Sequence, residues 1–235
     1  MSTAPRITAG VTAYKADRFL AEAIESILRQ SLPACEIIVV IDGSPDQSAA
    51  VAHSFAARGV RTIEHAQNRG IGAARNTIIE AMQGNYLAVL DADDLWTQDH
   101  LERLWSSLVT SPGHLLAFGR VRQFLCPQIP EDRRQTLKCP EEEAVAYVAG
   151  GMLAAKSVYD SAGPYDEALK VGEFIDWFMR VQDAGFSHAI CDDLVLMRRI
   201  HGENSSLVHR GTAQGYALAL KRALDRRRAA GADAP

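Results

Sequence analysis

The sequence predicts an α/β fold, a mostly parallel β-sheet flanked by helices. In the first half, short apolar segments rich in Ile and Val alternate with amphipathic segments of helical period. Strands that alternate with helices imply a parallel sheet with crossover connections. The strand segments are apolar almost throughout, as expected where helices cover both faces of a sheet. The composition agrees, because 47% hydrophobic and 23% charged residues are ordinary for a soluble globular protein.

The expected elements follow one another closely up to residue 110. Strands are expected at 7–13, 36–41, 60–65 and 86–90, and helices at 18–30, 46–58, 72–82 and 97–109. On the first helix, Leu20, Ile24, Ile27 and Leu28 form one apolar stripe, and Asp17 is the expected N-cap. Each helix lies between two strands, so each is interpreted as a crossover.

The second half is less regular. We expect a polar loop at 126–140, a buried segment at 150–155, a helix at 174–184, two short strands within 188–199 and a basic helix at 214–228. The last few residues should fray. The interpretation is a single domain over residues 1–235, with a regular half at 5–110, a less regular half at 111–210 and a basic C-terminal helix and tail at 211–235.

Charge and cysteine usage exclude several classes of protein. A net charge of −4 argues against a general nucleic-acid binder. The four cysteines are scattered without metal-ligand spacing, which favours reduced thiols. No apolar run approaches the roughly 20 residues of a membrane helix, and the first residues do not resemble a secretory signal. The expected compartment is the cytoplasm.

Three carboxylates, Asp91, Asp93 and Asp94, follow directly after the strand expected at 86–90. Ligand sites in open α/β sheets lie outside the carboxyl ends of the strands. Carboxylate oxygens suit Mn²⁺ or Mg²⁺, and such ions usually bind one or two carboxylates together with substrate phosphates. The residues alone leave two interpretations, a metal and phosphate site or the acidic start of a helix.

Two other strand ends also carry polar or aromatic residues. Thr12, Ala13 and Tyr14 end the first strand, where a hydroxyl and an aromatic ring could hold a flat heterocycle, although Tyr14 could equally pack on the sheet edge. Asp42 ends the second strand, and Gly43 permits a sharp turn after it. Asp42 could accept a hydrogen bond from a uracil-type N–H, or it could simply form the turn.

Residues 68–76 enter the third helix through two glycines. The segment contains a GxG pair, but Arg75 stands where a dinucleotide fingerprint has its third glycine, so a nicotinamide site is not expected. A helix entry lined by backbone N–H groups and Arg75 could face phosphate or sugar, with Asn68 beside it. Arg75 could also be a cation on the helix surface.

Taken together, segments 40–46, 68–76 and 91–96 resemble the motifs of family 2 glycosyltransferases of the GT-A fold, in the family's order and spacing. The resemblance covers roughly residues 5–205 and implies a Rossmann-like sheet whose residues 5–110 bind a nucleotide-sugar and whose residues 111–210 face an acceptor. It implies metal-dependent transfer from a donor that is most often a UDP-sugar, with Mn²⁺ or Mg²⁺. By matching positions, Asp93 would bind the metal, and the donor would contact Thr12, Ala13, Tyr14, Asp42, Asn68, Arg75, Asp91 and Ala92.

The second half resembles the family too. Segment 163–167 is similar to its GGFDE stretch, 173–180 to its EDxDLxxR pattern, and 198–205 to the stretch whose His can be a further metal ligand, here His201. His201 could instead be a loop His bonded to a carboxylate.

The sequence departs from the family pattern in three places. The family usually has Pro-Thr-Tyr-Asn where this sequence has Thr12-Ala13-Tyr14-Lys15, and Ile41 replaces the first Asp of Asp-Asp-Gly-Ser. Phe174 replaces the Asp that often supplies the general base of inverting members. The base is therefore expected to be Glu173 or Asp176, which lie three apart on one helix face and could point into one cleft. Glu173 is favoured because it follows Gly172 at the helix entrance.

The expected function is a metal-dependent, inverting hexosyl-type transfer from a nucleotide-sugar to an acceptor that the sequence does not identify. Two alternatives remain open, a catalytically weak or inactive nucleotide-sugar-binding protein, because of Phe174, and a nucleotidyltransferase, because of the acidic cluster. No nucleic-acid partner is expected, and peripheral contact with a membrane is left open.

Overall fold

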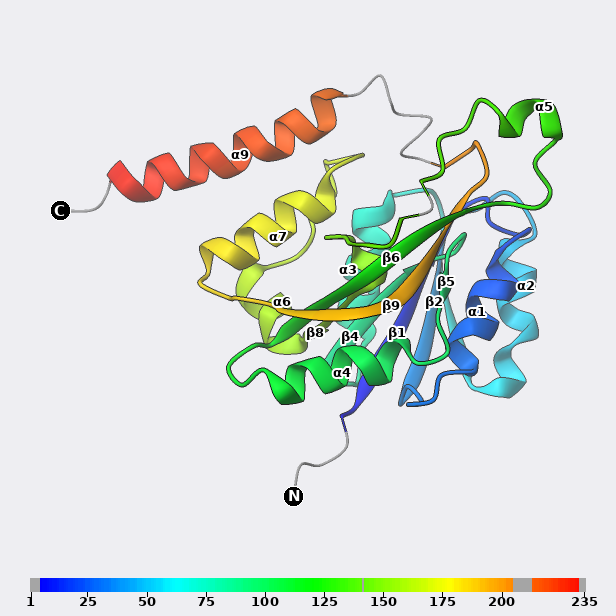
Figure 1. The fold of residues 1–235 in the computed structure, drawn as a ribbon, viewed down its shortest axis with the longest axis horizontal. Coiled ribbons are helices and arrows are strands. Elements are labelled where there is room, and N and C mark those ends of the chain that lie inside the picture. The colour runs from blue at the N-terminus through cyan, green and yellow to red at the C-terminus, as the bar shows by residue number, and fades with distance from the viewer. Residues whose placement is uncertain (1–4, 141, 205–212, 233–235) are drawn as a thin grey trace.

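A computed structural model describes residues 5–140, 142–204 and 213–232. The described residues form one nine-stranded sheet with helices on both faces (Figure 1). The strand order is β3-β2-β1-β4-β8-β6-β9-β5, and β7 pairs with β6 beside this path. None of the helices in these ranges is long and apolar enough to cross a membrane.

The N-terminal half is the expected parallel unit. Strands β1 (Ile7–Ala13), β2 (Glu36–Asp42), β3 (Val60–His65) and β4 (Tyr86–Asp91) are parallel neighbours. Helices α1 (Leu20–Leu28), α2 (Ser48–Ser54, with the 3₁₀ turn Ala56–Arg58) and α3 (Ile71–Ala81) connect them. Because the strands are parallel, their carboxyl ends meet at one edge of the sheet.

The C-terminal half extends the same sheet with antiparallel pairs. Strand β8 (Met152–Ala155) joins β4 to β6 (Leu116–Leu125), and β6 runs parallel to the 12-residue β9 (Ala189–Ile200). The short strands β5 (Leu95–Trp96) and β7 (Ala144–Val145) pair with β9 and β6. The remaining helices and turns are α4 (His100–Thr110), α5 (Glu131–Arg134), the 3₁₀ turn Ala149–Gly151, α6 (Lys156–Ala162), α7 (Glu173–Asp183) and α9 (Ala213–Ala232).

Two apolar layers hold the sheet between its helices. Along β2, Val39 and Ile41 face the layer under α1 and α4, whereas Ile38 and Val40 face the layer under α3 and α7. Successive side chains of a strand point to opposite faces, so a strand buried on both faces must be apolar throughout. This explains why the first four strands can be found in the sequence as continuous apolar runs.

Several expectations about local structure need correction. Asp17 is not the N-cap of α1, because the helix begins at Leu20 and the backbone N–H of Asp17 donates to Asp46 Oδ2 at 3.1 Å. Residues 188–199 form most of one long strand, not two short ones. Strand β6 was not expected, and Gly119 interrupts its apolar pattern. A Cβ on Gly119 would lie 2.4 Å from Val195 Cγ2, so the close approach of β9 requires a glycine there.

Candidate active site

The register of the parallel strands brings the expected site residues together. Thr12 of β1 is paired with Asp91 of β4, and Asp42 of β2 is paired with His65 of β3. Thr12 Oγ1 lies 3.4 Å from Asp91 Oδ1, and the backbone N–H of Ala92 donates to the Thr12 carbonyl at 3.3 Å. The carboxylate turn, defined as residues 91–94, therefore starts directly beside the end of β1.

The chain that follows β9 folds back over the carboxylate turn. His201 Nε2 and Asp93 Oδ2 are 3.0 Å apart, and Asn204 Nδ2 donates to the same oxygen at 3.2 Å. Asn204 also accepts the backbone N–H of His201 at 2.9 Å and donates to the Arg199 carbonyl at 2.7 Å. The expected proximity of His201 to Asp93 is thus present, and Asn204 fixes it. Ser205, which ends the matching stretch, lies outside the described residues.

Asn204 was not singled out in the sequence. The available signal was an amide three residues after His201, just beyond Gly202, whose φ is +85°. An amide in such a turn can bond the neighbouring backbone and hold a loop.

Asp94 connects the carboxylate turn to the end of β9. The Asp94 side chain is buried, and its Oδ1 accepts the backbone N–H of Arg199 at 2.8 Å. Burial, together with the carboxylates of Asp93 and Asp91, raises the pKa of Asp94 well above its usual range. Arg199 Nε donates to the Asp93 carbonyl at 2.9 Å, and its Nη2 bonds Glu22 at 2.6 Å. Three carboxyl groups therefore crowd one turn, which is an arrangement that a cation stabilises.

The donor atoms at this turn fit a divalent cation of the Mn²⁺ or Mg²⁺ type. Neighbouring ligands of an octahedral ion bound at 2.0–2.1 Å lie about 3 Å apart. The 3.0 Å between His201 Nε2 and Asp93 Oδ2 matches that spacing. Within the described ranges, no three or more His, Cys, Asp and Glu side chains gather closely enough to hold a metal by themselves. Two protein ligands would leave the remaining positions to phosphate oxygens and water, as is usual for Mg²⁺.

Arg75 lies at the centre of the site and is not a surface cation. Only 3% of it is exposed, and its guanidinium bonds Asp91 Oδ1 at 3.0 Å and Glu173 Oε1 at 2.6 Å. The ring of Tyr165 lies 5.6 Å from the guanidinium carbon. Burial lowers the pKa of Arg75, but the two carboxylates outweigh burial and raise it above its ordinary value. Arg75 thus links the end of β4 to the start of α7.

Asp42 is buried and already has three partners. Its Oδ1 lies 2.6 Å from His65 Nδ1 and accepts the Arg69 N–H at 2.9 Å, while Oδ2 accepts the Gly70 N–H at 2.8 Å. Asn68 Nδ2 donates to the Asp42 carbonyl at 3.3 Å, so the whole entry to α3 is fastened to this residue. A carboxylate has about four lone-pair sites. One site on Oδ2 therefore has no hydrogen-bond partner among the described residues, so the turn interpretation does not exclude the base-reading interpretation.

Tyr14 is exposed next to this edge, whereas Thr12 and Ala13 are buried. Lys15, which stands at the family's Asn position, has a φ of +51°, a left-handed conformation that costs little for Asn and more for Lys. The backbone N–H of Lys15 donates to Ser44 Oγ at 2.7 Å, and its Nζ lies 5.4 Å from the Tyr14 ring. The segments that follow β1 and β2 are thus joined by a hydrogen bond, and the Tyr14 ring is exposed beside them.

The expectation that Glu173 and Asp176 point into one cleft is wrong. Glu173 starts α7 and reaches Arg75, but Asp176 is paired with Arg180 at 3.1 Å and with Arg226 of α9 at 2.8 Å. The two carboxylates are three residues apart on α7, yet Asp176 faces the neighbouring helix α9. Asp176 therefore connects α7 and α9 through its arginine partners.

Phe174 is buried in an aromatic cluster. Its ring lies 6.3 Å from Phe118 and 6.2 Å from Phe178, and it also contacts Trp177. No carboxylate takes the place of the family's Asp at this position. Glu173 is the carboxylate of α7 that is linked to the carboxylate turn, because Arg75 bonds both Glu173 and Asp91.

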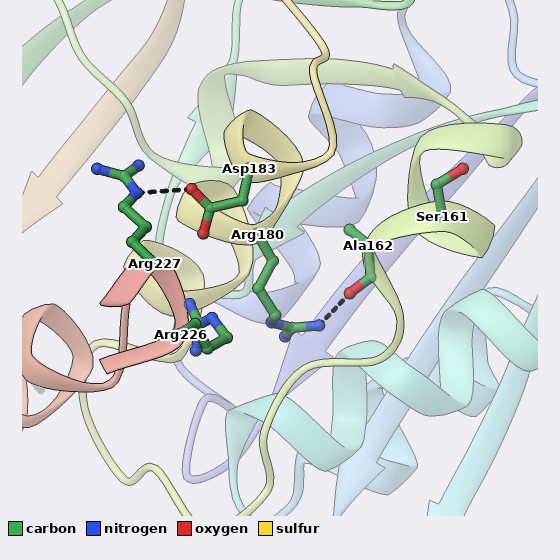
Figure 2. Close-up of a pocket in the computed structure, with 6 residues that line it drawn as sticks. All are labelled: Ser161, Ala162, Arg180, Asp183, Arg226 and Arg227. Atoms are coloured by element: carbon green, nitrogen blue, oxygen red, sulfur yellow. Dashed lines mark hydrogen bonds and ion pairs between the residues drawn. The ribbon is translucent and has the colours of Figure 1, made fainter. Parts of the chain in front are cut away.

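A hollow lies elsewhere, between α6, α7 and α9. It has a volume of about 420 Å³ and is lined by Ser161, Ala162, Arg180, Asp183, Arg226 and Arg227 (Figure 2). Figure 2 shows Arg227 reaching Asp183 and Arg180 reaching the backbone of Ala162, so these two cations already have partners. The carboxylate turn is not part of this hollow.

Comparisons of the sequence point to one family. A sequence model described as Glycosyl transferase family 2 matches residues 8–150. The uncharacterised glycosyltransferase EpsJ of Bacillus subtilis is 29% identical over 184 residues, which cover 72% of this chain and 54% of EpsJ. The succinoglycan biosynthesis protein ExoO of Rhizobium meliloti is 40% identical over 100 residues, or 43% of this chain and 29% of ExoO. The matched part of this chain thus covers about half of the length of EpsJ and less than a third of the length of ExoO.

Solved structures show the same architecture. The mannosyltransferase PcManGT of Pyrobaculum calidifontis, solved with GDP-Man and Mn²⁺, superimposes with a TM-score of 0.71 over 95% of this chain and 65% of its own, at 18% identity. Residues 1–349 of S. aureus TarS, solved with UDP-GlcNAc, give a TM-score of 0.66 over 83% of this chain and 58% of that one, at 15% identity. The family match over more than half of the sequence and the shared architecture lead to one conclusion: the chain belongs to glycosyltransferase family 2 and has the GT-A fold.

Proposed function

We propose that this chain transfers a sugar from a UDP-sugar to an acceptor hydroxyl, with a divalent cation and with inversion at the anomeric carbon. One observation carries the proposal. At one sheet edge, the Asp93–His201 pair lies next to Asp91, which Arg75 joins to Glu173. Relatives of similar fold were solved with UDP-GlcNAc or with GDP-Man and Mn²⁺, which supports a nucleotide-sugar donor.

Each part of the donor has a matching group. The exposed Tyr14 ring and the open lone-pair site of Asp42 would receive the base, with Thr12, Ala13 and Asn68 shaping the pocket. Asp91 and Ala92 would contact the ribose or sugar. Asp93 and His201 would hold Mn²⁺ or Mg²⁺, which supplies positive charge to the leaving diphosphate. Arg75 is committed to two carboxylates and would orient Asp91 more than bind phosphate directly.

The reaction would be a single displacement. The acceptor oxygen attacks the anomeric carbon from the side opposite to the diphosphate, and the bond between that carbon and the phosphate oxygen breaks. The electron pair of that bond leaves with UDP. The acceptor proton passes to Glu173, whose Oε1 is bonded to Arg75 and whose Oε2 makes no hydrogen bond among the described residues. Arg75 would hold this carboxylate in place for the transfer.

Phe174 favours a second candidate, a nucleotide-sugar-binding protein with weak or no transfer. The family's Asp position holds a buried aromatic side chain, and no other carboxylate takes that place. A chain with this arrangement could retain the donor site and lose turnover.

Product analysis separates the candidates. The protein is incubated with UDP- and GDP-sugars and Mn²⁺, and the released products are identified. We expect slow release of UDP, which the Asp93→Ala variant lacks. Tight UDP binding without turnover would establish the binding protein, and release of pyrophosphate in a separate reaction that supplies UTP and a sugar 1-phosphate would establish a nucleotidyltransferase. Either result would overturn the transferase proposal.

A further inference from the structure

His65 ends β3 beside the carboxylate that is proposed to read the base. The register of the parallel strands pairs His65 with Asp42, the last residue of β2. Side chains two residues apart on a strand share a face, so Asp42 points to the α3 side of the sheet, as Val40 does. His65 points to the same side, because its ring meets Thr77 of α3. The fold thus places an imidazole between the end of β2 and α3.

Both ring nitrogens of His65 have a partner. Nδ1 lies 2.6 Å from Asp42 Oδ1, and Nε2 lies 2.9 Å from Thr77 Oγ1. Because an ionised carboxylate only accepts hydrogen bonds, Nδ1 carries a hydrogen and donates it to Asp42. The Thr77 hydroxyl can accept from Nε2 or donate to it, so it holds the far edge of the ring in either case. The side chains of His65 and Asp42 are 6% and 4% exposed, and this burial strengthens both bonds.

The imidazole limits the direction in which Asp42 can accept a further hydrogen bond. Rotation of a carboxylate about its last torsion has no sharp preference, so the neighbours must set it. The N–H groups of Arg69 and Gly70 bond this carboxylate from the loop that enters α3. His65 is the one side chain that bonds it among the described residues, and His65 lies on a strand and is held in turn by a helix. A site supported by strands and helices is more precise than one supported by loops alone.

We propose that His65, held by Thr77, is a positioning residue that keeps the open acceptor position of Asp42 aimed at the ring N–H of a uracil base. This inference rests on the donor site of the proposed function. Uracil has a hydrogen on N3 and can donate it to a carboxylate, whereas N3 of cytosine has none. A carboxylate held in one orientation therefore favours UDP over CDP. His65 acts through Asp42 and does not itself touch the base.

Calorimetric titration of UDP and of CDP into the full chain, each with Mn²⁺, tests the inference. We expect the wild type to bind UDP about tenfold more tightly than CDP, or more, which is the range for a hydrogen bond to a charged group. In His65→Leu, UDP binding should weaken about tenfold while CDP binding stays within about twofold, so the preference for UDP is lost. His65→Asn should largely keep the preference, because an amide nitrogen takes the place of Nδ1 and can still donate to Asp42.

The matched control is His53→Leu. His53 Nε2 also lies 2.8 Å from a carboxylate, that of Glu64 on β3, but both side chains of this pair are exposed. This variant should keep the preference of the wild type. Thr77→Val, which removes only a hydroxyl, provides a second test if His65→Leu does not fold, and its preference for UDP should fall about two- to tenfold. Thermal unfolding shows which variants are folded.

The ratio of the two affinities decides the inference. A purely structural role of His65 would weaken UDP and CDP binding equally, so an unchanged ratio in folded His65→Leu would overturn the inference. If that variant does not fold, an unchanged ratio in Thr77→Val would do so. Loss of the preference in the His53→Leu control, or equal binding of UDP and CDP by the wild type, would also overturn it. A wild type that binds neither nucleotide would refute the proposed donor site as well, whereas selectivity that depends on His65 would support the inference even without sugar transfer.

Discussion

Replacing Arg75 by Met should destabilise the protein more than most single substitutions. The guanidinium is buried and holds Glu173, whose side chain is 10% exposed, and Asp91, whose side chain is 37% exposed. Removing one partner of a buried ion pair costs about 3–5 kcal/mol, because the other charge stays buried without compensation. Most of this cost should come from Glu173, since water screens the more exposed Asp91. The free energy of unfolding, measured in urea at pH 7, should fall by about that amount.

A double-mutant cycle isolates the pair. Glu173→Gln alone should cost about 1–3 kcal/mol, since Arg75 keeps Asp91 as a partner. Arg75→Met combined with Glu173→Gln should cost at least about 2 kcal/mol less than the sum of the single variants, because no uncompensated charge remains beside α7.

The matched control is Arg29→Met, which removes an exposed arginine paired with Glu25 on α1 and should cost about 0.5 kcal/mol or less. If Arg75→Met costs no more than this control, or if the two single variants are additive, Arg75 does not link β4 to α7 energetically, and the reasoning fails.

Three other predictions follow from the contacts of single side chains. Asp42→Asn should weaken UDP binding more than binding of free diphosphate in calorimetry; equal weakening would argue that Asp42 serves only the turn around Gly70. Glu173→Gln should cut transfer by about 10²–10⁴ with donor affinity unchanged, whereas Asp176→Asn should lower the melting temperature and leave turnover of folded enzyme intact; a larger kinetic effect of Asp176→Asn would reverse the assignment. Burial lowers the pKa of His100 to about 3, well under the usual 6.5. Because the unfolded chain binds this proton more readily, the free energy of unfolding should be unaffected by His100 above pH 6.5 and should decrease as the pH falls toward 3. The loss should reach about 2 kcal/mol at pH 5 in urea titrations, and His100→Gln should lack this acid dependence; an identical pH profile would show that His100 is not buried in the neutral form.

The fold of the first half could be predicted because local pattern and tertiary structure agree there. Continuous apolar runs such as 37–41 are what a strand covered on both faces requires, and glycines such as Gly59 mark helix ends directly. The second half is different. Gly119 in β6 is explained by a contact with Val195 on another strand, which no window of neighbouring residues contains.

The same distinction applies to the site. The strand ends at Thr12, Asp42 and Asp91 could be placed at one edge because parallel strands share their direction. The partners of Arg75 and Asp176 could not, since Glu173 is 98 residues from Arg75 and Arg226 is 50 residues from Asp176. Residue type alone does not distinguish a surface arginine from one that burial and two carboxylates hold inside the protein.

The central claim is that the carboxylate turn and His201 bind a divalent cation together with a nucleotide diphosphate. Calorimetric titration of UDP into the wild type and Asp93→Ala, each with and without Mn²⁺, tests it most directly. Asp93 Oδ2 already meets His201 Nε2 at 3.0 Å, so this oxygen is the expected protein ligand. We expect Mn²⁺ to strengthen UDP binding to the wild type, and Asp93→Ala to lose that dependence while unfolding at a similar urea concentration. An unchanged Mn²⁺-dependent UDP affinity in the folded variant would contradict the account.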